Sequence, residues 1–392
     1  MSVVFADGFV TAGVRAGISS VEGKKDVALV VNQGPLDVAA GVFTSNRFAA
    51  APVQYSRERI KSGHAKAVVI NSGGANACTG DAGYQQVLDT AEHAADTLSQ
   101  GITADDVLVA STGLIGELLP LDAVFRGVDL AAKELANDSS AGCCAAEAIM
   151  TTDTKPKTVE ITGNGFKMGG MVKGSGMIAP QLATMICVIT TDAVVTPQLA
   201  QNALRKATEK SFDRIDVDGC MSTNDTVLLL ASGASGVEPD NAEFEKLVAE
   251  ACTRLARQII GDGEGSSHDI KIEVNGAETE DAALACARAV ASSNLLKCAI
   301  YGNDPNWGRV VSSLGTVPSA VAAFDPRDVT VDINGIRVCD EGKPGQPREL
   351  VTMDEREVDI IIDLHTGMNE TATVWTDDLT LDYVHINADY ES

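Results

Sequence analysis

Asn-Gly pairs within segments of alternating hydrophobicity constrain the fold of this chain most strongly. They occur at residues 164–165, 275–276 and 334–335. The third pair lies in "DVTVDINGIRVCD" (328–340), where two alternating runs are separated by the two residues that a type I′ turn requires. Because such a turn joins neighbouring antiparallel strands, the sequence predicts mixed or antiparallel sheets, not a doubly wound parallel sheet.

Helical and strand patterns alternate along the whole chain. Buried strands are predicted from short apolar runs at residues 27–31, 67–70 and 107–110. Helices are predicted from apolar residues spaced three or four apart over residues 84–98, 243–260 and 281–296. The segment 371–390 alternates again, as a strand does. We therefore expect an α/β fold, a layered sandwich of mixed or antiparallel sheets flanked by helices.

Composition excludes several classes of function. The chain has 30 basic and 55 acidic residues, so its formal net charge is −25, and a protein of that sign repels a phosphate backbone. No stretch approaches the roughly 20 consecutive apolar residues of a membrane span. The first ten residues lack a basic start and meet Asp7 at once, unlike a signal peptide. These features predict a cytoplasmic protein that binds neither nucleic acid nor membrane.

The cysteines and histidines do not have the spacing of metal ligands. Nine cysteines form no CxxC pair, and five histidines form no HExxH motif. In a chain without a secretion signal, such cysteines are typically reduced and buried. We therefore expect no metal site. If the ligand is an anion, a local lysine has to supply the positive charge that this acidic chain otherwise lacks.

The segment "GSGMIAPQLATMICVITTDA" (174–193) places a threonine where a glycine-rich run meets an apolar segment. In the simplest interpretation, Thr184 is the first residue of a buried strand. In the chemical interpretation, its hydroxyl group attacks the carbonyl group of Ala183 and the chain breaks there. The freed α-amine, with a pKa of about 8, then acts as the base for the neighbouring hydroxyl group.

Attack on a carbonyl group also requires donors that stabilise an oxyanion. In "VLVASTGLIGELLP" (107–120) a predicted strand ends at Thr112 and Gly113, where a hydroxyl group and a backbone N–H could converge. An ordinary turn between a strand and a loop explains the same residues.

Three further segments contain candidate ligand contacts. In "MTTDTKPK" (150–157), Thr152 is either a ligand contact or part of a capped turn. In the loop predicted between glycines, Lys173 is expected to bind a carboxylate. Glu264, between glycines in "GDGEGSSH" (261–268), either belongs to a solvated turn or holds an ammonium group and moves protons.

Together these motifs resemble the ornithine acetyltransferase family, the glutamate N-acetyltransferases of arginine biosynthesis. The resemblance rests, in chain order, on "STGLIGELLP", "AIMTTDT", "GGMVKGSGMIAPQLATM", "STNDT", "GDGEG", "DPNWGR" and "INADY". It implies a precursor that cuts itself between Ala183 and Thr184. The products are an N-terminal fragment, residues 1–183, and a C-terminal fragment, residues 184–392. This is an autoprocessed two-fragment fold like that of N-terminal-nucleophile enzymes.

The resemblance also implies an activity and roles for individual residues. The acetyl group moves from N2-acetylornithine to glutamate in the cyclic pathway of arginine biosynthesis, through an acetylated Thr184 and a ping-pong sequence. Thr112 and Gly113 match the oxyanion hole. Substrate contacts are implied for Thr152, Lys173, Thr184, Glu264, Asn387 and Ser392. Thr151 and Thr154 are alternative matches to Thr152 within the same motif.

No dissociable cofactor is implied, and cleaved heterodimers are expected to associate into a heterotetramer. The resemblance leaves open whether acetyl-CoA is a second donor, and whether the pathway is a housekeeping or a secondary-metabolite one. Two other interpretations stay open. The first is an N-terminal-nucleophile aminopeptidase or amidase, which passes the acyl group to water. The second is a non-catalytic amino-acid-binding scaffold, which neither cleaves itself nor becomes acetylated.

Overall fold

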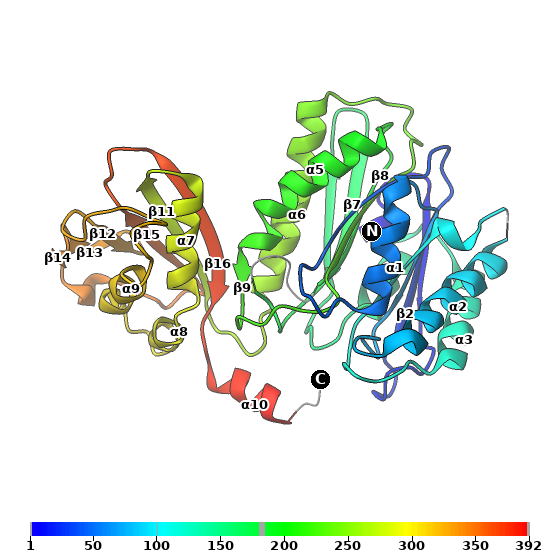
Figure 1. Ribbon diagram of the computed structural model, residues 1–392, viewed down its shortest axis with the longest axis horizontal. Coiled ribbons are helices and arrows are strands. Elements are labelled where there is room, and N and C mark those ends of the chain that lie inside the picture. Colours follow the sequence, from blue (N-terminus) through cyan, green and yellow to red (C-terminus); the bar gives the residue numbers. More distant parts are fainter. Residues whose placement is uncertain (1, 100, 180–184, 390–392) are drawn as a thin grey trace. The chain divides into compact units, whose positions relative to one another are not determined.

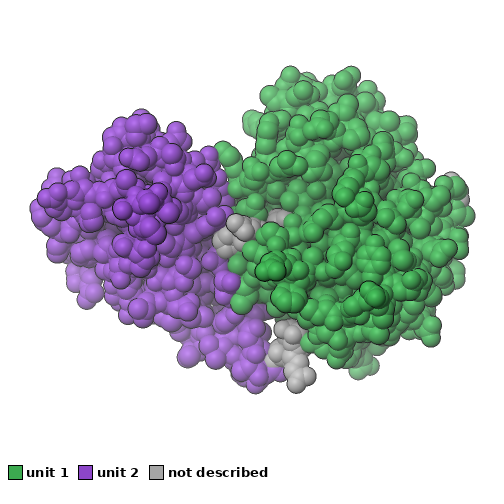
Figure 2. Space-filling view, in the orientation of Figure 1, with its two compact units in different colours: residues 1–213, 220–259, 391–392 green, residues 214–219, 260–390 purple. Residues whose placement is uncertain are grey.

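The computed structural model describes residues 2–99, 101–179 and 185–389. The chain divides into two compact units, which Figure 2 distinguishes by colour. Unit 1 is formed by the residues up to Asp213 together with Cys220–Ile259. Unit 2 is formed by Arg214–Gly219 and Ile260–Tyr390. Each unit has its own sheets and helices (Figure 1), and each is described separately below.

Unit 1 contains two mixed sheets. The first has the strand order β1-β2-β4-β5 and consists of β1 (Phe9–Val14), β2 (Val27–Asn32), β4 (Ala67–Asn71) and β5 (Val107–Ser111). The second has the order β3-β10-β8-β7-β6 and consists of β3 (Val38–Phe43), β10 (Thr226–Ala231), β8 (Ile186–Thr191), β7 (Lys167–Lys173) and β6 (Lys157–Thr162). The pairs β4–β5 and β8–β10 are parallel, and the other pairs are antiparallel.

Helices flank the paired sheets of unit 1. They are α1 (Ala51–Arg59), α2 (Gly80–Leu98), α3 (Leu121–Glu134), α4 (Ser139–Ala148), α5 (Pro197–Glu209) and α6 (Asn241–Ile260). Val68 and Leu108 of the first sheet share one buried core with Val188 and Leu228 of the second. Helices α2 and α3 cover the other face of the first sheet (Figure 1). The predicted layered α/β sandwich with flanking helices is therefore confirmed.

Glutamine side chains from the covering helices bind both edge strands of the second sheet. Gln201 of α5 accepts a hydrogen bond from the N–H of Gly41 in β3 and donates one to its carbonyl group, both at 3.1 Å. Gln258 of α6 accepts a hydrogen bond from the N–H of Thr158 in β6 at 3.2 Å and donates one to its carbonyl group at 3.1 Å. These two side chains occupy backbone groups that an edge strand otherwise presents to another chain.

Unit 2 has a single seven-stranded sheet of order β14-β13-β12-β15-β11-β16-β9. Its strands are β9 (Ile215–Asp216), β11 (Asp269–Ala277), β12 (Thr330–Ile333), β13 (Ile336–Asp340), β14 (Lys343–Pro344), β15 (Glu357–Asp363) and β16 (Glu370–Asp377). Its helices are α7 (Glu280–Ala291), α8 (Asn294–Tyr301), α9 (Trp307–Leu314) and α10 (Leu381–Asp389). Residues of α7, α8 and α9 share one core with the sheet, so unit 2 has a helical layer on its sheet.

The three Asn-Gly pairs lie in different local structures: a hairpin turn, a loop and the interior of a strand. Asn334 and Gly335 have φ angles of +46° and +80° and join β12 to β13 with Ile333 opposite Ile336, which confirms the predicted type I′ hairpin. The pair at 164–165 lies in the loop between the antiparallel strands β6 and β7. The pair at 275–276 lies inside β11, where the pairing with β16 shifts register, so no turn forms there.

Two predictions of secondary structure need correction. The helix predicted over 281–296 ends at Ala291, because Ser293 caps a new helix, α8, by accepting a hydrogen bond from the N–H of Leu296. The alternating tail is a strand only as far as Asp377. From Leu381 onward it is helix α10, because the Thr380 hydroxyl group accepts a hydrogen bond from the N–H of Tyr383 at 3.0 Å and so caps the start of a helix.

We find no single helix among the described residues that is long and apolar enough to cross a membrane. Helices α7 and α8 reach that length and composition only as a pair, and they are bent by 59° at their junction. Both helices contribute to the buried core of unit 2.

We expect Gly13→Ala to destabilise unit 1, because a Cβ atom on this residue of β1 would lie 2.0 Å from the carbonyl oxygen of Cys144 in α4. Overpacking of this kind costs about 1–3 kcal/mol of the free energy of unfolding, or more where backbone must move. Gly302→Ala is the control, since its nearest neighbouring atom is 3.5 Å away and its φ of −84° suits alanine. Urea unfolding measures both variants, and equal midpoints would contradict the expectation.

Candidate active site

Thr112 and Gly113 follow the last residue of β5 and are fixed by neighbouring backbone. The N–H of Thr112 donates to the carbonyl oxygen of Asn71 at 2.9 Å, and its side chain is buried. Gly113 has a φ of +132°, and a Cβ atom there would lie 2.6 Å from the backbone nitrogen of Gly74. Glycine is therefore the residue that this conformation and this close approach both permit.

Lys173 is not in a loop, as the sequence suggested, but is the last residue of β7 and is 2% exposed. The glycines before it belong to the strand: a Cβ atom on Gly169 would lie 2.1 Å from the carbonyl oxygen of Ser2, so close packing of the N-terminal segment requires glycine there. The Lys173 ammonium group lies 3.4 Å from the hydroxyl oxygen of Thr112. The structure thus brings together two residues that the sequence singled out separately.

Two lysines and one aspartate form a buried cluster in this region. The carboxylate of Asp153 accepts hydrogen bonds from the ammonium group of Lys157 at 2.6 Å and from the N–H of Gly174 at 2.7 Å. Burial raises the pKa of Asp153, but the charges of Lys173 and Lys157 outweigh it and hold the pKa below its usual value. Burial lowers the pKa of Lys173, and the charge of Asp153 opposes that shift. The cluster supplies the local positive charge expected in this acidic chain.

Asn224 and Asp225, from the "STNDT" motif, are site residues to which sequence reasoning assigned no role. The Asn224 side-chain amide donates to the carbonyl oxygens of Ala75 at 2.6 Å and Ser111 at 2.7 Å. These two residues are the neighbours of Gly74 and Thr112, which form an isolated β-bridge, so Asn224 fixes both chains at that bridge. Asp225 accepts a hydrogen bond from the N–H of Met185 at 3.0 Å. The signal that could have revealed them is the position of two adjacent polar residues directly before a strand whose residues are all buried and, after Thr226, all apolar.

Three of the predicted site residues, Ala183, Thr184 and Ser392, lie outside the described residues. Thr152 is half-buried beside Asp153. In that segment the Asp153 side chain accepts hydrogen bonds from Lys157 and Gly174, and the contact of Thr152 with substrate stays a prediction.

The two candidate residues of unit 2 contact each other. Glu264 lies in the turn after α6 and is 9% exposed, and Asn387 lies on α10. The side-chain amide of Asn387 donates to the Glu264 carboxylate at 2.8 Å and also to the carbonyl oxygen of Tyr383 at 3.0 Å. Because a carboxylate has further lone pairs, this contact leaves Glu264 able to accept hydrogen bonds from a cationic ligand.

The sequence comparisons with known proteins cover all or nearly all of the chain. The sequence profile of the ArgJ family matches residues 10–392. This chain belongs to the ArgJ family. It is 70% identical to the arginine biosynthesis bifunctional protein ArgJ of Bifidobacterium longum and 55% identical to that of Streptomyces coelicolor, and each alignment covers 100% of both chains. The resemblance inferred from the ordered motifs is confirmed.

A solved structure of an ArgJ relative also aligns. It is ornithine acetyltransferase from Mycobacterium tuberculosis, complexed with ornithine. The alignment has 44% sequence identity and a TM-score of 0.45, and it covers 47% of this chain and 96% of that one.

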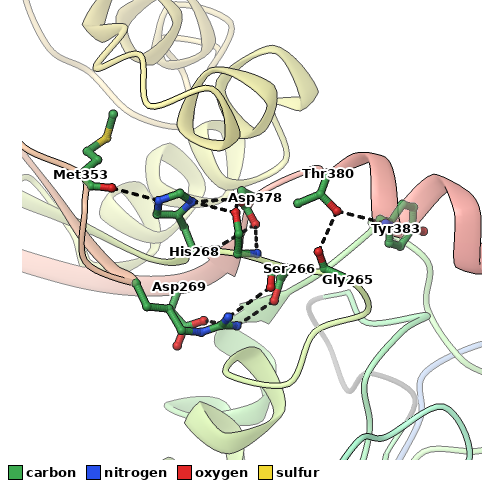
Figure 3. Close-up of polar contacts among 10 residues, drawn as sticks. Gly265, Ser266, His268, Asp269, Met353, Asp378, Thr380 and Tyr383 are labelled. Atoms are coloured by element: carbon green, nitrogen blue, oxygen red, sulfur yellow. Dashed lines mark hydrogen bonds and ion pairs between the residues drawn. The ribbon is translucent and has the colours of Figure 1, made fainter.

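In this ArgJ family member, a buried carboxylate holds the segment that follows Glu264. Asp378 accepts hydrogen bonds from the backbone N–H groups of Ser267 at 2.8 Å and His268 at 3.1 Å. It also accepts from the Ser267 hydroxyl group and from Nδ1 of His268 at 2.8 Å. Thr380 adds a hydrogen bond to the carbonyl oxygen of Gly265 at 2.7 Å. Figure 3 shows these contacts between the segment and the chain that leads into α10.

Ser267, His268 and Asp378 have the residue types of a hydrolase triad but not its geometry. Nδ1 of His268 faces both Asp378 and, at 3.1 Å, the Ser267 hydroxyl group. Nε2 faces the carbonyl oxygen of Met353 at 3.2 Å (Figure 3). A histidine that activates a serine contacts the carboxylate and the hydroxyl group through different ring nitrogens. The cluster is therefore a loop anchor, and the pairing of Glu264 with Asn387 rests on it.

We expect Asp378→Ala to loosen this anchor, because two backbone N–H groups and two side chains lose their acceptor. Leaving the buried donors of His268 unpaired costs about 1–3 kcal/mol each, and the exposed Ser267 donors cost less because water can replace the carboxylate. Hydrogen exchange of the Ser267 and His268 amides should become faster, and the free energy of unfolding of unit 2 should fall. Ser267→Ala is the control, since it removes one donor and keeps the carboxylate; amide exchange as fast as in Asp378→Ala would count against the anchor.

Proposed function

We propose that this chain transfers the acetyl group of N2-acetylornithine to glutamate through an acetylated Thr184. The observation that carries the proposal is the match to the ArgJ family over residues 10–392, together with full-length identity of 70% to a curated relative named for arginine biosynthesis. The buried cluster of Thr112 and Lys173 supports the chemistry, because it sets a hydroxyl group and a cation at one place in unit 1.

The proposed reaction has two halves. The Thr184 hydroxyl group attacks the acetyl carbonyl of acetylornithine, its proton moves to the α-amine of the same residue, and that proton then leaves with the ornithine nitrogen. Thr112 and Gly113 stabilise the oxyanion that forms in between. Glutamate attacks the resulting ester in the second half, and the proton path is reversed. The buried Lys173 ammonium group, next to the Thr112 hydroxyl, adds positive charge beside the developing negative charge.

Substrate recognition is proposed for the residues that the resemblance assigned to it. Glu264, oriented by Asn387, is a suitable partner for the side-chain ammonium group of ornithine, since opposite charges with hydrogen bonds make strong contacts. Lys173 is a suitable partner for an α-carboxylate. Thr152 and Ser392 complete the proposed contacts. No dissociable cofactor takes part, because one amino acid acetylates the enzyme and the other removes the acetyl group.

Self-cleavage between Ala183 and Thr184 would leave two fragments within one sheet. Residues 1–183 contribute β3, β6 and β7, and residues 184–392 contribute β8 and β10 in the order β3-β10-β8-β7-β6. The strands of the two fragments are interleaved, which supports a cleaved heterodimer that stays folded. The proposal includes association of such heterodimers into a heterotetramer, and action in the cytoplasm.

We expect the purified protein to give two bands of roughly half the chain mass on a denaturing gel, since the cut lies near mid-chain and frees the threonine amine. Edman sequencing of the second band should begin Thr-Met-Ile-Cys. Thr184→Ala should give one full-length band and no transfer, whereas Thr184→Ser should cleave and transfer more slowly, because the hydroxyl group remains without the methyl group that restricts its rotamer. An active protein that runs as one full-length band would disprove the cleavage.

We also expect wild-type enzyme given acetylornithine alone to gain about 42 Da on the C-terminal fragment, the mass of one acetyl group in covalent catalysis. Double-reciprocal plots against both substrates should be parallel. Free acetate in place of acetylglutamate would identify an amidase instead. Intersecting plots without an acetylated fragment would indicate direct transfer in a ternary complex. Because the curated relatives are named bifunctional, the same mass assay should be run with acetyl-CoA.

A further inference from the structure

Asp225 has a buried carboxyl group and directly precedes β10, one of the two central strands of the second sheet of unit 1. Strands β8 and β10 run parallel with Ile186 opposite Thr226. Met185 and Asp225 each precede one of these paired residues, so the register brings them side by side. Oδ1 of Asp225 accepts the N–H of Met185 at 3.0 Å, and the side chain is 0% exposed.

The second carboxyl oxygen has no partner of its own. Among the described residues, no donor lies within hydrogen-bond geometry of Oδ2. Burial raises the pKa of Asp225 well above its usual value. The N–H of Met185, the Lys173 ammonium group and the hydroxyl groups of Ser222 and Thr44 act in the opposite direction. A buried carboxyl oxygen without a donor is costly and uncommon, so it indicates a group that binds there in another state of the protein.

Self-cleavage creates such a group one residue away. Three covalent bonds separate the backbone nitrogen of residue 184 from that of Met185, so the two atoms lie about 3 Å apart. In the uncut chain this nitrogen is a neutral amide; after the cut it is a primary amine that can carry a proton. A carboxylate that holds the N–H of the second residue through one oxygen is therefore well placed to hold the terminal amine through the other.

We propose that Asp225 binds the new α-amino group of the C-terminal fragment and stabilises its protonated form. This assignment rests on the proposed self-cleavage. In acyl transfer the Thr184 hydroxyl proton moves to the amine as the carbon–oxygen bond forms, and passes to the ornithine nitrogen as the carbon–nitrogen bond breaks. Asp225 stays a carboxylate throughout and gains or loses no atom. Its role is to place the amine and to compensate the positive charge that appears on it.

The test is the pH dependence of kcat/KM in Asp225→Asn. The amine has to be unprotonated to act as a base, so its pKa sets the acid limb of the profile. A carboxylate in contact raises that pKa, and the amide of asparagine does not. The acid limb of the variant should therefore move to lower pH by about one unit or more. Asparagine retains an oxygen that accepts the N–H of Met185, so self-cleavage should still occur.

Asp192→Asn is the matched control. Asp192 follows the other end of β8, is 1% exposed, and accepts backbone N–H groups of Asp7 at 3.1 Å and Lys167 at 2.7 Å. The control should lose stability to a similar extent and keep the acid limb of the wild type. A second measurement needs no variant: the pH dependence of reductive methylation of the terminal amine in cleaved wild-type enzyme. It should give a pKa above the ordinary value of about 8.

Each outcome has one meaning. The assignment is supported if the acid limb of the kcat/KM profile lies at lower pH in Asp225→Asn than in the wild type, if the acid limb of Asp192→Asn does not move, and if the amine pKa of the wild type is raised. An unchanged acid limb overturns it, and so does an amine pKa at or below the ordinary value. A variant that folds but stays uncut also overturns it, because Asp225 would then act in cleavage itself. A wild-type protein that is never cut refutes the proposed function, and this result is distinct from the others.

Discussion

The parallel pairing of β8 with β10 is the interaction on which the rest of unit 1 depends. Every residue of both strands is buried, and they form the centre of the second sheet with β7 and β3 on either side. Their register aligns Met185 with Asp225. The adjacent Asn224 reaches the loop that carries Thr112. One pair of strands thus positions both Met185, the second residue of the proposed C-terminal fragment, and the proposed oxyanion hole.

The charged groups at this end of the sheet are stable only because they are paired. Lys157 and Lys173 are almost fully buried in a chain of net charge −25. An isolated buried ammonium group would be costly, but the Asp153 carboxylate and the N–H of Gly174 complete the cluster. The arrangement gives the acidic protein a small positive region, which suits substrates that carry carboxylates.

Sequence patterns predicted the layered fold and the long helices α2 and α6, because apolar spacing over four or more turns has few other solutions. Patterns also singled out Thr112, Lys173 and Glu264, and the family resemblance added Asn387; the structure joins these four residues in two contacts. They placed Lys173 in a loop because glycines commonly break strands; here the glycines admit the N-terminal segment against β7. Asp153 binds Gly174, 21 residues away, and Asp225 binds Met185, 40 residues away, and no local pattern reveals those contacts.

The glutamines at the two edges of the second sheet have a consequence for how copies of this protein can meet. A strand from another molecule that added to β3 or β6 would have to displace Gln201 or Gln258 from backbone groups already in use. Growth of the sheet from one molecule into the next is therefore opposed at both ends. Contacts between copies of this chain at these two edges are therefore left to side chains, such as those of α5 and α6, and not to new backbone pairing with β3 or β6.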